Sequence, residues 1–304
     1  MEATISWAEA HDANVSQKTS ALDTTLPHDT LAALTEELIM RFLSLLLAFA
    51  ATQATAHEFW IEPLDYTVDP DAIIVGDLVN GELFEGTKFP YLPQTFTNFT
   101  QYVDGRAEPV EGRIGNRPGL QTPPLAEGLN VITYRSRANT VDYPDMAKFQ
   151  RFADHKDFAT WAEDHRARGL PETDFKELYT RYAKTLVAVG DGAGRDLRTG
   201  LETEIVALTN PYTSPGAPVD VQVFYRNAPR ADTQVELFEK APGGEVTVTL
   251  HRTNGNGVAR LSVKPGHSYL VDAVVLREPS NAMQSQRGVV WETLWASLTF
   301  GVPG

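Results

Sequence analysis

The sequence predicts a mainly β protein with two β-sandwich-like domains and a helical insertion between them. Three observations predict this architecture. Short segments rich in β-branched and aromatic residues recur between turn signals in residues 57–143 and again in residues 200–304. Residues 144–190, between them, are dominated by helix-forming residues. The composition is globular, with 42% apolar and 22% charged residues, and 304 residues suffice for about two domains.

A secretory signal pattern occupies residues 40–56 rather than the first residues of the chain. Met40-Arg41 supplies a basic start, an apolar run follows to Ala50, and Ala54-Thr55-Ala56 matches a signal-peptidase cleavage site. The apolar run is too short for a membrane span, which needs about 20 residues. We therefore expect Met40 to be the true start and residues 1–39 to be a wrongly assigned N-terminal extension.

Cleavage after Ala56 would make His57 the first residue of the mature chain. Removal of the first 56 residues, which carry two basic and seven acidic side chains, leaves 248 residues and a formal net charge of −9, against −14 for the whole chain. This organisation predicts a protein of the bacterial periplasm. No second hydrophobic segment predicts a membrane span in the mature chain.

The N-terminal β domain is expected over residues 57–143. Strands are predicted near residues 72–79, 95–103 and 130–135, and the second ends in the turn signal Asp104-Gly105.

The helical insertion is expected over residues 144–190, with its clearest helix between Pro171 and Val187. Proline suits a first helical turn, and Gly190 suits a helix stop. The helix is predicted by one apolar stripe at helical spacing, formed by Phe175, Leu178, Tyr179, Tyr182, Leu186 and Val189.

The C-terminal β-sandwich is expected over residues 200–304, because seven strand candidates recur with turns between them. Clean alternation in Val219/Val221/Val223 and in Val246/Val248/Leu250 predicts that these side chains face the core. The seven candidates span residues 202–208, 219–225, 234–239, 246–252, 258–263, 269–276 and 291–300.

Composition excludes several classes of function. The chain has no cysteine, so it holds no disulfide, thiolate metal site, iron–sulfur cluster or thiol nucleophile. Its acidic balance argues against a nucleic-acid partner. No catalytic constellation and no motif for an organic cofactor occurs in the sequence.

His57 is the leading candidate for a metal ligand. A mature N-terminal histidine offers its α-amine and a ring nitrogen from one residue, and such nitrogen ligands suit copper, nickel or zinc. The alternative is that His57 only follows the cleavage site and points into solvent. His155 is the favoured second ligand, although His155 and His165 are otherwise expected to be solvated residues of a helix face.

Several motifs cover most of residues 57–304. They are Ala56-His57-Glu58-Phe59-Trp60-Ile61-Glu62-Pro63, Gly81-Glu82-Leu83-Phe84-Glu85-Gly86, the segment from Tyr179 to Gly190, Gly200 to Val206, Thr209-Asn210-Pro211 and Val235-Glu236-Leu237-Phe238. Through these motifs the chain resembles a family of secreted bacterial proteins of unknown function that are often labelled as nickel or cobalt uptake proteins. The resemblance implies a C-terminal domain similar to transthyretin and carboxypeptidase-regulatory sandwiches.

These observations favour a non-enzymatic periplasmic binding protein for a transition metal or its chelate. Such a protein would serve an uptake system, with an inner-membrane or outer-membrane transporter as its partner. Two alternatives stay open. One is a copper-dependent, polysaccharide-active oxygenase that uses the mature N-terminal histidine, and the other is a non-catalytic protein- or carbohydrate-binding module.

Overall fold

The computed structural model describes residues 57–304. The predicted signal peptide at residues 40–56 and the expected extension at residues 1–39 lie outside the described residues. With 50% strand and 11% helix, the structure confirms the mainly β class. Among the described residues, no helix combines the length and the apolar character needed to cross a membrane.

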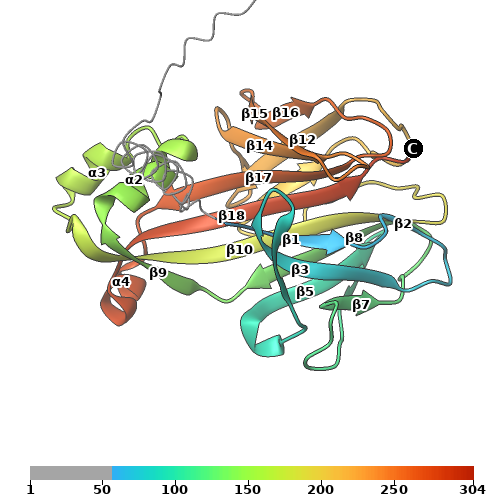
Figure 1. The fold of residues 1–304 in the computed structure, drawn as a ribbon, viewed down its shortest axis with the longest axis horizontal. Helices are drawn as coiled ribbons and strands as arrows, with labels where there is room; N and C mark the ends of the chain where they lie inside the picture. The colour runs from blue at the N-terminus through green and yellow to red at the C-terminus, as the bar shows by residue number, and fades with distance from the viewer. Residues whose placement is uncertain (1–56) are drawn as a thin grey trace, which may run out of the picture. The chain divides into compact units, whose positions relative to one another are not determined.

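A ten-stranded sheet forms the middle of the fold and takes strands from both predicted β regions (Figure 1). Its main path runs β15-β14-β17-β18-β10-β8-β5-β6, while β2 and β9 also pair with β10. In that order the strands are Val246–Arg252, Gln234–Lys240, Ser268–Arg277, Val289–Gly301, Thr173–Val189, Gly128–Ser136, Phe96–Val103 and Arg106–Pro109, with β2 at Thr67–Val68 and β9 at Asn139–Asp145.

Two four-stranded sheets cover opposite faces of the middle sheet. Neighbouring residues of β8 and β10 show this, because Val131 and Leu186 enter the core shared with one outer sheet, whereas Ile132 and Val187 enter the core shared with the other. The first outer sheet contains β1 (Glu58–Pro63), β3 (Ile74–Glu82), β4 (Glu85–Phe89) and β7 (Leu120–Thr122). The second contains β11 (Thr203–Ala207), β12 (Val219–Tyr225), β13 (Ala228–Pro229) and β16 (Val258–Leu261).

The helix predicted between Pro171 and Val187 is wrong, since this segment is the 17-residue strand β10. It pairs in parallel with β18 and antiparallel with β8 and β9. From Tyr182 to Val189 every residue is buried, because both faces of the strand are covered. A strand that is buried on both faces is apolar at nearly every position, and such a run also contains apolar residues at helical spacing. The apolar stripe therefore fits a central strand as well as a helix.

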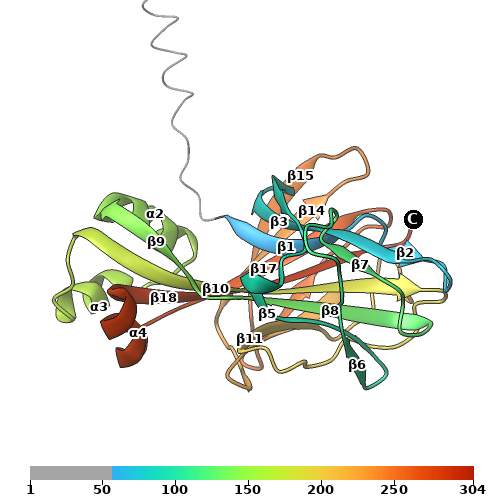
Figure 2. The same ribbon diagram turned by 90° about the horizontal axis from the view of Figure 1, so that it is seen from below.

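The helical insertion lies at one end of the middle sheet (Figure 2). Helices α2 (Met146–His155) and α3 (Trp161–Ala167) surround the ends of β9, β10 and β18, together with α4 (Asn281–Arg287) and away from the outer sheets. An aromatic cluster holds this end together, and the helices contribute Phe149, Phe152 and Trp161 to it. Trp291 and Trp295 of β18 belong to the same cluster, and both are buried. A short 3-10 helix, η1 (Pro93–Thr95), precedes β5.

The β3–β4 hairpin explains the motif from Gly81 to Gly86. Leu83 and Phe84 form its turn with φ angles of 51° and 61°, the left-handed pair of a type I′ hairpin. Gly81 and Gly86 face each other across the hairpin, where a Cβ on Gly81 would lie 1.9 Å from the carbonyl oxygen of Glu85. The turn buries Phe84 against Trp60, with the ring centroids 5.9 Å apart.

Strand alternation was predicted correctly for one C-terminal strand and wrongly for another. Val219, Val221 and Val223 of β12 are buried, as expected. Val248 and Leu250 of β15 are 41% and 62% exposed instead. The reason is that β15 is an edge strand, so a period of two does not ensure that another layer covers the apolar face.

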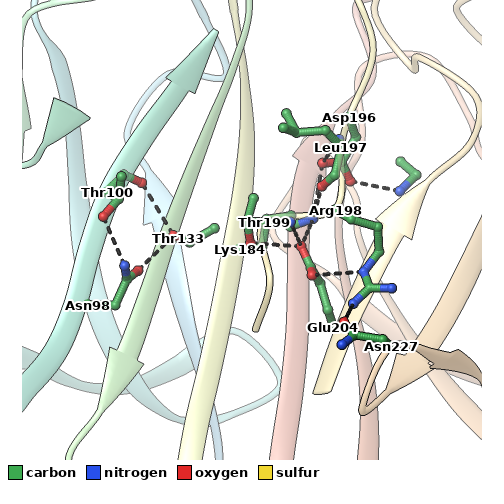
Figure 3. A network of polar contacts seen from close by, with 11 residues as sticks. Asn98, Thr100, Thr133, Lys184, Asp196, Leu197, Arg198, Thr199, Glu204 and Asn227 are labelled. Carbon is green, nitrogen blue, oxygen red and sulfur yellow. Dashed lines mark hydrogen bonds and ion pairs between the residues drawn. The ribbon is translucent and has the colours of Figure 1, made fainter. Parts of the chain in front are cut away.

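A buried ionic network ties the middle of β10 to the second outer sheet (Figure 3). The Lys184 ammonium lies 3.1 Å from Asp196 and 2.7 Å from Glu204, and it also donates to the carbonyl oxygen of Leu197. Glu204 accepts further hydrogen bonds from Thr199 and Arg198. Each charge in this network therefore has partners that offset its removal from water.

Removing one partner from this network should be costly. We expect Lys184→Ala to lower the free energy of unfolding by about 3–5 kcal/mol, because Asp196 and Glu204 would keep their buried charges without a counter-ion. Urea unfolding of residues 57–304 measures the change. Lys264→Ala is the matched control, since the exposed Lys264–Glu239 pair should contribute less than about 1 kcal/mol. Similar losses in the two variants would contradict the structural role of Lys184.

Candidate functional site

The structure places the two predicted metal ligands on neighbouring segments but in different surroundings. His57 is exposed immediately before β1 and lines a cavity of about 240 Å³. His155 is exposed at the end of α2, where its Nε2 lies 3.4 Å from a carboxylate oxygen of Glu236. The hydrogen bond with Glu236 raises the pKa of His155 above its ordinary value. His155 is thereby paired with Glu236, and His57 is the histidine at the cavity.

The segments of the two histidines meet at one buried ammonium group. Lys156, next to His155, lies 3.1 Å from Glu58, the residue after His57. The same ammonium lies 3.0 Å from Glu236 on β14 and 2.9 Å from Asp272 on β17. All four side chains are buried. We call these four residues the Lys156 cluster.

Three carboxylates share the Lys156 ammonium. Burial raises the pKa of Glu58 and Asp272, whereas His155 and Lys156 hold the pKa of Glu236 below its ordinary value despite its burial. Burial alone would lower the pKa of Lys156, but attraction to Asp272, Glu58 and Glu236 raises it well above its ordinary value. Burial, together with repulsion from Asp272 and Glu236, raises the pKa of Glu58 to about 7 despite the attraction of Lys156. The carboxylate oxygens could hold a divalent cation, but the Lys156 ammonium already lies within hydrogen-bond distance of all three.

Arg181 is the central cationic group of the cavity that His57 lines. It projects from β10, and its Cζ lies 4.1 Å from the ring centroid of Trp295 and 5.1 Å from that of Tyr179. Its Nε and Nη1 atoms are buried and have no hydrogen-bond partner among the described residues. Burial lowers the pKa of Arg181, and the charges of Asp272 and Glu58 counteract this shift. A guanidinium stays protonated under such conditions, so the cavity contains an unpaired positive charge.

A second cavity of about 320 Å³ shares Asn80, Tyr179 and Arg181 with the first. Its wall is more apolar and includes Phe59, Phe89 and Tyr134. Arg181 thus borders a cavity of mixed polar and apolar lining next to His57 on one side and a more apolar cavity on the other. This arrangement suits a small ligand with an anionic group and an apolar part.

Hydrogen bonds hold the aromatic base under Arg181 in place. Trp295 donates from Nε1 to the Thr293 hydroxyl at 2.9 Å, and Thr293 in turn donates to Glu177. Tyr143 donates to the other carboxylate oxygen of Glu177 at 2.8 Å. Burial raises the pKa of Glu177, although these two hydrogen bonds favour its ionised form. Both oxygens of Glu177 therefore already accept hydrogen bonds from other side chains. The Arg181 side chain remains available to a ligand in the cavity.

The expectation for His165 is wrong, because it is a buried residue of the aromatic cluster. Its Nδ1 accepts a hydrogen bond from Trp291 at 3.0 Å, and its Nε2 lies 3.0 Å from the carbonyl oxygen of Pro171. Helices α2 and α3 are separate, so His155 and His165 do not share a helix face.

Arg181 and Lys156 are not among the site residues that the sequence predicts. A signal for Arg181 was present, since a cation within the apolar run of β10 must find a partner or border a cavity. For Lys156 no local signal existed, because its carboxylates come from three distant segments.

A model of a protein family, described as Domain of unknown function (DUF4198), matches residues 54–277. The chain belongs to this family. The DUF4198 match includes His57, the Lys156 cluster and Arg181, whereas β18 with Trp295 follows its end. No curated protein matches the chain. The DUF4198 match confirms the expectation that the chain belongs to an uncharacterised family.

The raised pKa of Glu58 predicts how stability depends on pH. With a pKa of about 7 in the folded state and an ordinary value of 4.5, the folded protein binds more protons than the unfolded protein between these pH values. The contribution of Glu58 to the free energy of unfolding is complete below pH 4.5 and is lost as the pH rises through 7. We expect Glu58→Gln to remove this decline, which is on the order of 3 kcal/mol.

The measurement is urea unfolding of residues 57–304 in metal-free buffer from pH 4.5 to 8. Taking the difference between wild type and variant cancels the groups that titrate in both proteins. Glu85→Gln, on the exposed strand β4, is the matched control and should follow the wild-type curve. Parallel curves for wild type and Glu58→Gln would show that Glu58 does not titrate in this range.

Proposed function

We propose that this protein is a non-enzymatic periplasmic binding protein that takes a transition-metal chelate and serves an uptake system. The observation that carries the proposal is that His57 and the unpaired Arg181 line the same cavity. One group can coordinate a metal, and the other can bind the anionic part of a chelator.

His57 supports the metal part of the proposal. Signal-peptide removal after Ala56 would free its α-amine next to the imidazole, which together form a nitrogen chelate. Glu58, the next residue, is buried and bonded to Lys156, so the chain is tied down one residue from its new end. The resemblance to proteins labelled for nickel or cobalt uptake points to the same group of metals.

The charges around the cavity favour a chelate over a bare ion. Lys148 and Arg181 line it with His57, and both repel a free cation. Glu177 is its acidic lining residue, and both of its oxygens accept hydrogen bonds from the protein. A chelator would supply the remaining metal ligands and would carry the negative charge that Arg181 and Lys148 attract.

Nickel titration tests the terminal ligand. We expect a chain that begins at His57 to bind Ni²⁺–picolinate at least about tenfold more tightly than His57→Ala, because the variant lacks the ring nitrogen. A chain with one alanine added before His57 should lose a similar factor, since its α-amine is displaced. Isothermal titration calorimetry measures the three affinities. Equal affinities would refute the terminal chelate.

Elemental analysis of the native protein is the companion measurement. Nickel, cobalt or copper in protein purified without a tag supports metal carriage. A separate incubation with copper, a reductant and a polysaccharide tests the alternative enzyme, and oxidised sugar products would replace the binding-protein proposal with a copper oxygenase.

A further inference from the structure

We infer that Arg181 is a carboxylate-binding group and that the two cavities beside it take a small aromatic or aliphatic carboxylate. The carboxylate would bind the guanidinium, and the apolar body of the ligand would lie along Phe59 and Tyr134. The inference rests on the proposed function in one respect only, because this carboxylate would belong to the chelator. Carboxylate binding itself needs no metal and is measured without one.

The contrast with Lys156, Lys184 and Arg277 supports this role. Lys156 has three carboxylate partners, and Lys184 has two. Arg277 is bonded to Glu292 through two nitrogens and also to Glu202. Within residues 57–304, the Arg181 side chain has no ion-pair partner, and its Nε and Nη1 atoms donate no hydrogen bond to any oxygen. Because no hydrogen bond within the described residues uses its Nε and Nη1 groups, Arg181 can offer them to an external anion.

The position of the guanidinium fits a planar anion. Trp295 and Tyr179 contact Arg181 through their rings, which stabilises the cation without using its N–H groups. Thr293 fixes the Trp295 ring by accepting a hydrogen bond from it. The N–H fork thus remains available for a bidentate bond with a carboxylate.

The surroundings favour a carboxylate over a phosphate. Asn80, Ser136 and Asn139 add neutral polar groups near Arg181, while Glu177 adds an acidic one. A doubly charged phosphate would meet Arg181 and Lys148 but also the carboxylate of Glu177, whereas a carboxylate carries one charge that matches Arg181. Inorganic phosphate also has no apolar part that could pack against Phe59, Phe89 and Tyr134 in the second cavity.

Benzoate is the probe for the experiment, because it carries a carboxylate and an apolar ring but no second metal ligand. The experiment measures benzoate binding to residues 57–304 by NMR titration in metal-free buffer. We expect saturable binding to the wild type and at least tenfold weaker binding to Arg181→Gln. Arg181→Lys should bind with intermediate affinity, since lysine keeps the charge but lacks the fork. Arg113→Gln, an exposed arginine, is the matched control and should bind like the wild type.

Benzamide provides a test that needs no variant. It replaces the carboxylate of benzoate with a neutral amide, and the wild type should bind it at least tenfold more weakly. Inorganic phosphate should not displace benzoate, and displacement would assign Arg181 to oxyanions in general. No saturable benzoate binding by the wild type, or equal affinity for benzoate and benzamide, would overturn the inference.

The outcomes separate this inference from the proposed function. If benzoate binds through Arg181 but His57→Ala leaves the Ni²⁺–picolinate affinity unchanged, the carboxylate site stands and the metal proposal fails. If His57 controls nickel affinity but Arg181→Gln does not affect benzoate, the metal proposal stands and the carboxylate inference fails.

Discussion

Strand β10 places two cations inside a three-layered β structure, and much of the architecture serves to compensate them. Arg181 and Lys184 are three residues apart, so they project from opposite faces of the strand. Lys184 projects with Leu186 toward the second outer sheet, and Arg181 projects with Ala183 toward the first. Because both faces of β10 are covered, neither charge is fully hydrated, and each depends on what the covering layer offers.

The two faces meet this requirement differently. On the Lys184 side, Asp196 and Glu204 come from the segment that leads into β11 and from β11 itself, and their hydrogen bonds are complete. On the Arg181 side, the first outer sheet and the helical end leave two cavities instead of a counter-ion. One strand therefore carries a structural cation on one face and a ligand-binding cation on the other.

The position of His57 follows from the way β1 is anchored. Ser297 and Thr299 of β18 donate hydrogen bonds to the backbone carbonyls of Phe59 and Ile61, at 2.7 and 2.6 Å. Glu58 binds Lys156 from the helical end. These contacts hold β1 across the middle sheet and so bring the residue before it to the mouth of the Arg181 cavity.

Local patterns predicted what depends on local chemistry. The C-terminal strands were predicted within a few residues, because each lies between turn residues such as Pro242-Gly243-Gly244. The sequence predicts a helix at β10 because the layers that cover both faces of this segment, rather than its own apolar periodicity, determine its secondary structure. The Lys156 cluster could not be predicted, since its hydrogen bonds join residues 98, 80 and 116 positions apart. His57 was identified from the cleavage pattern, but its relation to Arg181 depends on tertiary structure.

Trp295 connects the Lys156 cluster with the Arg181 cavity, because Lys156 Nζ lies 5.0 Å and Arg181 Cζ 4.1 Å from its ring centroid. The cluster has more carboxylates than cations, and the charges of Asp272 and Glu58 favour the charged form of Arg181. An anion bound to Arg181 would add negative charge beside a cluster in which three carboxylates already share the Lys156 ammonium. By linkage, anion binding and protonation of this cluster favour each other, so a falling pH should strengthen the binding of a metal-free carboxylate at Arg181.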